Sequence, residues 1–312
     1  MLDLMIRVLD FALPILLMIF LGLFGTGLLI ELGLMQKLTG LTKPLIKHTN
    51  LPEECGAAFV VSLGSTFAAN SMIVKVRDNG CISDRQTMLC AILNSTPAYI
   101  REILTYQIPI VLPALGFIVG GFYVGVFILT AIVKISVIII LSRIWFEDSK
   151  CTPAKEVKKE RPTLKKALSK IFHREKKLFT KIAIIYLSMT TLVFALRERG
   201  AFEIFSVLPL AEIFGIPPES IVPLTTYVAS PILGVSLLGP MIGEGSITYI
   251  QAMIVLMLGS MFMLPIFAFR TILPRYVALF GPKLGAKIVT LSTGISIIVR
   301  FCILVVLLMI AR

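Results

Sequence analysis

The fold class is decided by residues 122–144, which read FYVGVFILTAIVKISVIIILSRI. Only Lys134 and Arg143 are charged in this run, and an α-helix needs about 20 apolar residues to cross the hydrocarbon core of a bilayer. Similar runs recur along the 312 residues, of which 57% are hydrophobic and 15% charged, with a mean hydropathy of +0.93. Soluble domains have about 45–50% apolar and about 25% charged residues. The composition excludes a soluble enzyme, and the unbroken runs exclude β-barrel alternation. They predict an all-α polytopic membrane protein.

The apolar runs form two halves with the same order of elements. We divide the chain into a first repeat at 1–146, a basic linker at 147–177 and a second repeat at 178–312. Each half has four apolar runs and one amphipathic segment after the first of them. The runs are Phe11–Ile30, Gly56–Val74, Thr87–Leu104 and Phe122–Ile144, then Leu178–Leu196, Ile221–Leu238, Tyr249–Phe269 and Leu284–Ile310, and the amphipathic segments are Leu34–Ile46 and Phe202–Phe214.

A shift of 165 positions superimposes the two halves without a gap. The matched residues are largely Gly, Pro, Ser, Gln and Glu, which chance similarity between apolar segments does not align. We interpret the pattern as an internal repeat. The pairs include Pro52 with Pro217, Ser65 with Ser230, Gly80 with Gly245, Gln86 with Gln251, Ser95 with Ser260, Pro109 with Pro274 and Gly116 with Gly281.

The second apolar run of each half is interrupted near its middle, by Gly64-Ser65-Thr66 in one and by Ser230-Pro231 in the other. We predict that both runs are re-entrant hairpins, so that each repeat crosses the membrane three times and the second copy is inverted. The linker has twelve Lys/Arg against five Asp/Glu between Glu147 and Lys181. The positive-inside rule then places the linker in the cytoplasm and both termini outside the plasma membrane. The alternative is two helices rich in small residues that pack closely against their neighbours.

A break is predicted in the following run, where Leu93 to Glu102 reads LNSTPAYIRE. Pro97 removes an amide donor and clashes with the preceding turn, so the helix should break at Asn94–Thr96. Free backbone groups and three polar side chains at one level can coordinate a polar solute or a cation. The alternative is a structural kink in which the Ser and Thr side chains satisfy the freed backbone.

These features resemble the nucleoside-recognition, or Gate, domain family, which includes the membrane part of ferrous iron transporter B and spore-maturation membrane proteins. The shared features are the Ser-Thr-Pro-Ala-Tyr break, the Gly-Ser-Thr segment before it and the duplicated layout, over about residues 11–310. The chain differs from the iron transporter because it has no P-loop and has Ser and Thr instead of Cys at the break. The resemblance implies an inverted-repeat protein whose site is formed by hairpin tips and broken helices. The implied site residues are Gly64, Ser65, Thr66, Asn94, Ser95 and Thr96, and in the second copy Ser230, Pro231, Gly259 and Ser260.

Four charged residues are predicted at membrane depth: Arg101, Glu102, Lys134 and Arg300. A charge in the membrane is costly unless it is paired or hydrated, so these residues are candidates for gating or charge pairing at the site. Arg101 and Glu102 are adjacent and cannot face each other on a helix, so each needs its own partner. The alternative is snorkelling or a structural ion pair.

Other chemistry has little support in the sequence. The five cysteines are scattered singly and the two histidines have no ligand-spaced neighbours, so we expect no structural disulfide, zinc site or cofactor. Nucleotide-binding and hydrolase motifs are missing, so we expect no enzyme activity. Leu164–Ile182 has the spacing of a basic amphipathic helix, which indicates binding to anionic lipid, with a docking helix for a cytosolic partner as the alternative.

The sequence therefore predicts a membrane protein that transports or recognises a small polar solute, either a nucleoside or base or an ion, at a mid-membrane site without nucleotide hydrolysis. The alternative function is a non-transporting scaffold or sensor that binds a partner protein. The expected partners are the lipid bilayer and the solute, with no nucleic acid, and a homo-oligomer is left open.

Overall fold

The computed structural model describes residues 48–146 and 209–311, together with short helical pieces within 5–21 and 176–195. These residues form helices and turns, with no β-strand among them. The first stretch contains α4 (Glu53–Ser62), α5 (Thr66–Asp78), α6 (Asp84–Leu93), α7 (Thr96–Glu102), the π-helix η2 (Ile103–Val111) and α8 (Leu112–Trp145). The second contains α10 (Pro209–Phe214), η4 (Pro218–Ser220), α11 (Ile221–Ala229), α12 (Pro231–Gly243), α13 (Tyr249–Phe267), the π-helix η5 (Ala268–Ile272), α14 (Leu273–Phe280) and α15 (Pro282–Ala311).

Three helical stretches of the described chain are long and apolar enough to cross a membrane: Asp84–Trp145, Tyr249–Phe280 and Pro282–Ala311. Large apolar side chains are exposed along them, including Phe117 at 83% and Phe269 at 75%, and burial in lipid removes the cost of that exposure. The prediction of an all-α polytopic membrane protein is therefore confirmed. The predicted amphipathic helix Leu164–Ile182 and the segment Leu34–Ile46 fall largely or wholly outside the described residues.

Backbone conformations repeat between the halves at the same spacing of 165 positions. Ser65, between α4 and α5, has φ −153° and ψ 108°, and Ser230, between α11 and α12, has φ −154° and ψ 108°. Each half also has a capping box at the start of its next helix, where a hydroxyl side chain and a glutamine three residues later cap each other. These boxes are Ser83 with Gln86 at α6 and Thr248 with Gln251 at α13.

A sharp elbow joins the last two helices of each half. The elbow residues are Gly116, with φ of +76°, and Gly281, with φ of +82°, a region that residues with a Cβ rarely adopt. Gly116 divides the 84–145 stretch into two arms, as Gly281 separates α14 from α15. Each half thus ends in a helix of membrane-spanning length that begins at a glycine turn.

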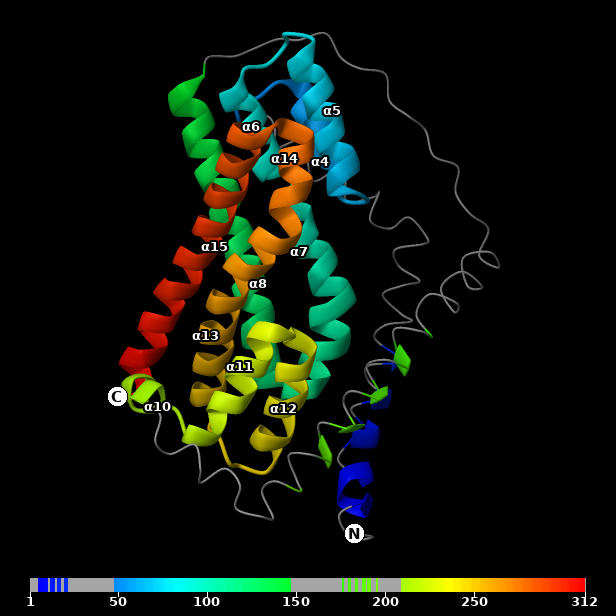
Figure 1. The fold of residues 1–312 in the computed structure, drawn as a ribbon, viewed down its shortest axis with the longest axis vertical. Helices are drawn as coiled ribbons and strands as arrows, with labels where there is room; N and C mark the ends of the chain where they lie inside the picture. Colours follow the sequence, from blue (N-terminus) through cyan, green and yellow to red (C-terminus); the bar gives the residue numbers. More distant parts are fainter. Residues whose placement is uncertain are drawn as a thin grey trace.

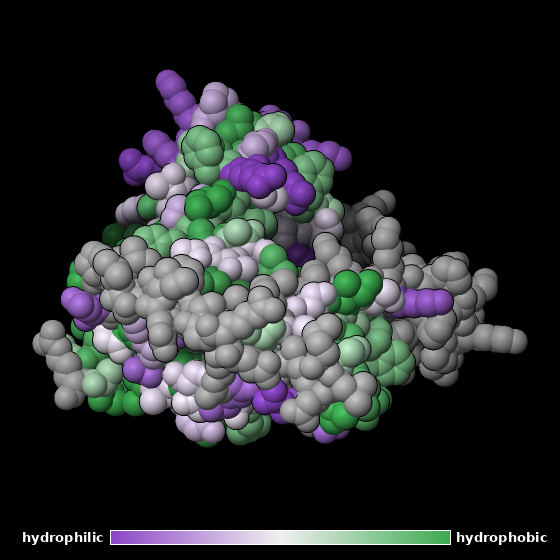
Figure 2. Space-filling model, turned by 60° about the horizontal axis from the view of Figure 1, so that its bottom comes forward, coloured by the Kyte–Doolittle hydropathy of each residue, from purple (hydrophilic) through white to green (hydrophobic). Residues whose placement is uncertain are grey.

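The two hairpins lie at opposite ends of the molecule, α4–α5 at the top of Figure 1 and α11–α12 at the bottom. The helices that follow them run in opposite directions, because α6 continues downward through α7 while α13 rises toward α14. Each end has its own apolar core, around α4–α6 with the start of α15 and around α11–α13 with the start of α8. Figure 2 shows hydrophilic side chains at the top of the view and along its lower edge, with many apolar side chains between them.

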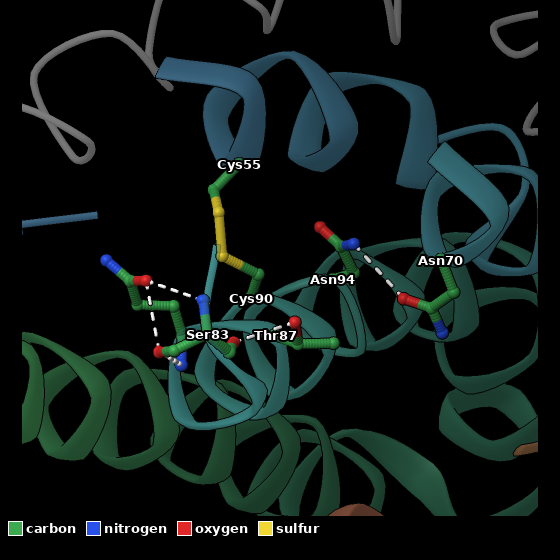
Figure 3. The surroundings of a disulfide bond; sticks show 7 residues. Cys55, Asn70, Ser83, Thr87, Cys90 and Asn94 are labelled. Carbon is green, nitrogen blue, oxygen red and sulfur yellow. Dashed lines mark hydrogen bonds between the residues drawn. A yellow bond between two sulfur atoms is a disulfide. The ribbon is translucent and has the colours of Figure 1, made fainter. Parts of the chain in front are cut away.

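The prediction that no structural disulfide forms is wrong. Cys55 of α4 is bonded to Cys90 of α6, with their Cα atoms 5.6 Å apart (Figure 3). Both residues are fully buried in the core at this end. Sequence spacing hid the pair because the two cysteines are 35 positions apart and meet only when the α4–α5 hairpin packs on α6.

Candidate functional site

A cavity of about 950 Å³ lies between the two apolar cores. Its position is clearest along α15, where Ile288 belongs to one core and Leu304 to the other. Between them Ser292, Ser296 and Arg300 line the cavity. Because α15 is long enough to span a bilayer, these residues lie near the middle of its length.

The turn of the α4–α5 hairpin reaches the cavity through Thr66. Its hydroxyl is buried and has no hydrogen-bond partner among the described residues. The other two predicted residues shape the turn instead. Ser65 caps α5 by accepting a hydrogen bond from the amide of Ala68 at 3.2 Å, and the carbonyl of Gly64 accepts one from Arg101 at 3.3 Å.

The predicted helix break is confirmed, since α6 ends at Leu93 and α7 begins at Thr96 with Pro97 in its first turn. The Ser95 hydroxyl donates to the carbonyl of Ile92 at 2.6 Å, and the Thr96 hydroxyl donates to that of Leu93 at 2.8 Å. Both hydroxyls therefore satisfy freed backbone, as the structural-kink alternative expects. Ser95 also lines the cavity, whereas Thr96 does not.

Asn94 is fully buried behind the cavity wall. Its Nδ2 donates to Oδ1 of Asn70 at 3.1 Å, and Asn70, on α5, lines the cavity (Figure 3). The contact ties the first hairpin to the break in the next helix. Asn94 thus positions a cavity residue and does not itself face the cavity.

The second half contributes the turn Ser230-Pro231 and the mid-helix residue Ser260, and all three line the cavity. Gly259 does not line it. A Cβ at Gly259 would lie 2.9 Å from Cδ1 of Tyr227, so this glycine allows the buried ring of Tyr227 to pack against α13. The cavity therefore receives a hairpin turn and a serine from each half, Ser95 at the break between α6 and α7 and Ser260 within α13.

All four predicted charged residues line the cavity. Lys134 and Arg300 are the most buried, at 3% and 2% exposed. Lys134 donates from Nζ to Oγ of Ser292 at 2.8 Å, and Arg300 donates to the carbonyl of Ser296 at 3.1 Å. In the described part of the chain none of the four makes a salt bridge, although Glu102 interacts electrostatically with Arg300 and Arg101.

A network of hydroxyl groups joins these cations, and sequence reasoning missed most of it. The Tyr99 hydroxyl and Oγ of Ser296 are 2.9 Å apart, and Oγ of Ser95 and Ser292 are 3.5 Å apart. The Lys134 ammonium lies 4.9 Å from the centre of the Tyr99 ring. A signal was present, because Ser292, Ser296 and Arg300 recur at every fourth position of a largely apolar helix and so share one face.

Several buried polar atoms on the cavity wall have no partner within the described residues. Gln107 is fully buried, and neither its Oε1 nor its Nε2 is hydrogen-bonded. The same holds for the hydroxyl of Tyr106 and for Nε of Arg300. An unsatisfied buried polar group costs about 1–3 kcal/mol, so a wall with this many favours a polar occupant or water.

Metal binding was not predicted, and the stretches that the structure describes hold no group of three or more His, Cys, Asp or Glu side chains able to bind a metal ion. The free cysteines among them, Cys81 and Cys302, are exposed. What the cavity offers is serine, threonine, tyrosine and amide groups with several cations. Such groups bind a polar molecule through hydrogen bonds and charge.

Comparison with known proteins supports the predicted resemblance for part of the chain. Residues 12–120 match the family model described as nucleoside recognition, or Gate. One uncharacterized protein of Methanocaldococcus jannaschii is 23% identical over 97% of this chain and 99% of its own length, and a second is 25% identical over 90% of each chain. A third from the same organism is 24% identical over 92% of this chain and 90% of its own. No solved structure matches the chain significantly. The wider link to the iron transporter and the spore-maturation proteins stays a prediction.

Proposed function

We propose that the cavity is a mid-membrane site at which the protein binds a small polar solute and transports it without nucleotide hydrolysis. The observation that carries the proposal is the meeting of two hairpin turns and a broken helix around one polar cavity. Sites at interrupted helices near the membrane midplane are typical of secondary transporters. The match of residues 12–120 to the nucleoside-recognition model supports the same class of function.

We infer that the two halves are inverted repeats and that the hairpins are re-entrant. The equal torsion angles of Ser65 and Ser230 support a repeat, and the hairpins at opposite ends of Figure 1 support its inversion. The hairpin arms α4, α5, α11 and α12 have 10, 13, 9 and 13 residues. At about 1.5 Å per residue, each is shorter than a hydrocarbon core of about 30 Å.

We further propose that the α4–α6 end faces the cytoplasm and that both termini lie outside. Between 209 and 249, at the α11–α12 end, the sequence has three glutamates and no Lys or Arg. Basic residues instead occupy the other end, in agreement with the positive-inside rule. They are Lys75, Arg77, Arg85, Arg143, Lys283 and Lys287.

Gln107 provides the sharpest test of the binding site. Gln107→Leu keeps the volume of the side chain and removes two unpaired polar atoms, so its thermal stability should equal or exceed that of the wild type. Its ligand-dependent stabilisation and its uptake of solute into liposomes should be lost. Ser236→Ala is the matched control, because Ser236 is buried on α12 but does not line the cavity.

The binding experiment uses purified protein with nucleosides, bases, metal ions and small organic ions. Binding by wild type and Ser236→Ala but not by Gln107→Leu supports the site. If Gln107→Leu unfolds at a lower temperature and still binds, the amide is structural and the site is wrong. A well-folded wild type that binds and transports none of these solutes would favour the scaffold or sensor function.

Orientation is tested by labelling single introduced cysteines from each side of the membrane, in a background without Cys81, Cys151 and Cys302. Cysteines within 150–170 should react only from the cytoplasm, and a cysteine at Gly243 only from outside. Labelling of positions 75 and 243 from the same side would refute the inverted arrangement. The same proposal includes a plasma-membrane location, contact of the linker with anionic lipid, a homo-oligomer and the lack of enzyme activity.

A further inference from the structure

We propose that the solute bound in the cavity is an anion whose carboxylate or phosphate group is held by Lys134 and Arg300. The inference rests on the proposed function and names the chemical class of its solute. It is carried by two cations that are at least nine-tenths buried and face the same cavity from different helices, α8 and α15.

Neither cation makes a salt bridge within the described chain, and only Arg300 interacts electrostatically with a carboxyl group, that of Glu102. Lys134 makes its hydrogen bond to a neutral hydroxyl, and its charge lies over the ring of Tyr99. Arg300 donates to a neutral carbonyl and lies 5.4 Å from the centre of the Phe127 ring, and its Nε has no partner. Burying a charge without a salt-bridge partner is unfavourable, and two buried cations share at most one carboxylate here, so an anion in the cavity would lower the cost of burying both.

The hydroxyl network holds the two cations in place. Ser292 accepts from Lys134, and the backbone carbonyl of Ser296, four residues further along the same face of α15, accepts from Arg300. The Tyr99 hydroxyl also bonds Oγ of Ser296. Cations that are already fixed lose little side-chain entropy when an anion binds, which favours affinity.

The other charged residues of the cavity wall are mostly basic. Arg101, Arg270 and Arg275 also line the cavity, against a single carboxylate, Glu102. Five basic groups and one acidic group give a positive potential in a cavity with largely apolar walls, which concentrates anions and repels metal cations. With an uncharged solute, the single carboxylate Glu102 would face five basic groups, so the charge balance favours an anion over a neutral nucleoside.

The test measures thermal unfolding of the full chain in phosphatidylcholine nanodiscs, at constant ionic strength set with sodium chloride. The probes are sodium phosphate, sodium succinate and neutral uridine. We expect phosphate or succinate to stabilise the wild type. Lys134→Gln and Arg300→Gln should each weaken the affinity for the anion about thirtyfold or more, so that a correspondingly higher anion concentration is needed for the same rise in Tm. Truncating one partner of a buried charged pair costs at least about 2 kcal/mol, which corresponds to that ratio.

Controls separate binding from folding. Lys287→Gln removes a basic side chain from an exposed position on the same helix as Arg300 and should bind the anion like the wild type. Lys134→Arg keeps the positive charge and should retain anion binding. If Lys134→Gln loses anion binding and Lys134→Arg does not, the charge is responsible, even where Lys134→Gln is less stable.

Each remaining outcome is decisive. Stabilisation by uridine alone would overturn the anion assignment and leave the proposed function standing. Stabilisation by none of the three probes would overturn the anion assignment, while the proposed function would fall only if the wider set of nucleosides, bases, metal ions and organic ions also failed to bind. A second preparation replaces part of the phosphatidylcholine with phosphatidylglycerol, and stabilisation by that lipid alone, lost in Lys134→Gln, would make a lipid headgroup the occupant and overturn the solute assignment.

Discussion

At the first glycine elbow, we predict that alanine lowers the stability of the fold at Gly120 but raises it at the adjacent Gly121. Gly120 lies four residues after the positive-φ Gly116 and packs against the backbone of the short arm that precedes this elbow. A Cβ at Gly120 would be 2.6 Å from Cα of Leu112. The equivalent Gly285 would place a Cβ 2.7 Å from the carbonyl carbon and oxygen of Tyr276. We predict that Gly120→Ala and Gly285→Ala destabilise the fold by opening the elbow.

The magnitude follows from these distances. Carbon atoms pack best at about 3.5–4.0 Å, so backbone must move by about 1 Å to admit the methyl group. Overpacking of this kind costs about 1–3 kcal/mol, and the better helix propensity of alanine returns about 1 kcal/mol. At Gly121, the neighbouring residue, a Cβ meets no atom within 4 Å. Gly121→Ala should therefore raise the free energy of unfolding through the better helix propensity of alanine alone. The two variants should therefore differ by about 2 kcal/mol.

Thermal unfolding of purified protein in detergent measures the difference. For a chain of this size, about 2 kcal/mol corresponds to roughly 3 °C in Tm. Gly294 serves as the control on α15, because a Cβ there also meets no atom within 4 Å. Equal Tm values for Gly120→Ala and Gly121→Ala would refute the close approach of the helices at the first elbow, and equal values for Gly285→Ala and Gly294→Ala would refute it at the second.

Three further predictions concern the α4–α6 region and its counterpart. Cys90→Ala should lower the free energy of unfolding by about 2–4 kcal/mol, because the Cys55–Cys90 bond closes a loop of 35 positions; a wild-type Tm insensitive to reductant would contradict it. Ser83→Ala and Thr248→Ala should each cost about 1 kcal/mol through loss of a capping box, and denaturation midpoints that do not shift in parallel would argue against equivalent helix starts. Asn70→Ala should cost about 1–3 kcal/mol in thermal unfolding, since it leaves a buried amide without its acceptor, and an unchanged Tm would exclude that contact as a stabilising one.

Local features of the fold were predictable from sequence because they depend on single residues. Pro97 predicts the break between α6 and α7, and the interruptions at Gly64-Ser65-Thr66 and Ser230-Pro231 predict the turns between α4 and α5 and between α11 and α12. Each of these residues restricts or frees the backbone in a way that neighbouring elements do not reverse. The confirmed class of all-α polytopic protein depends similarly on composition and run length.

The cavity wall was only partly predictable, because burial depends on which face of each helix turns inward. Thr66, Ser95, Ser230 and Ser260 line the cavity, whereas Asn94, a polar residue at the same break, lies behind the wall. In the same way Tyr99, Ser292, Ser296 and Gln107 join the cavity through packing between helices that are distant in sequence. Sequence periodicity groups residues on a face but does not say what that face contacts.

The disulfide makes the two hairpins mechanically unequal. It tethers the first arm of one hairpin to the helix beside it, with the two Cα atoms 5.6 Å apart. The positions 165 residues further along are Ser220 and Val255, which cannot form such a bond. Non-covalent packing alone restrains the α11–α12 hairpin against α13. In a transport cycle that moves the hairpins, the larger displacement would therefore fall to α11–α12, while the α4–α5 hairpin serves as the anchored side against which the other moves.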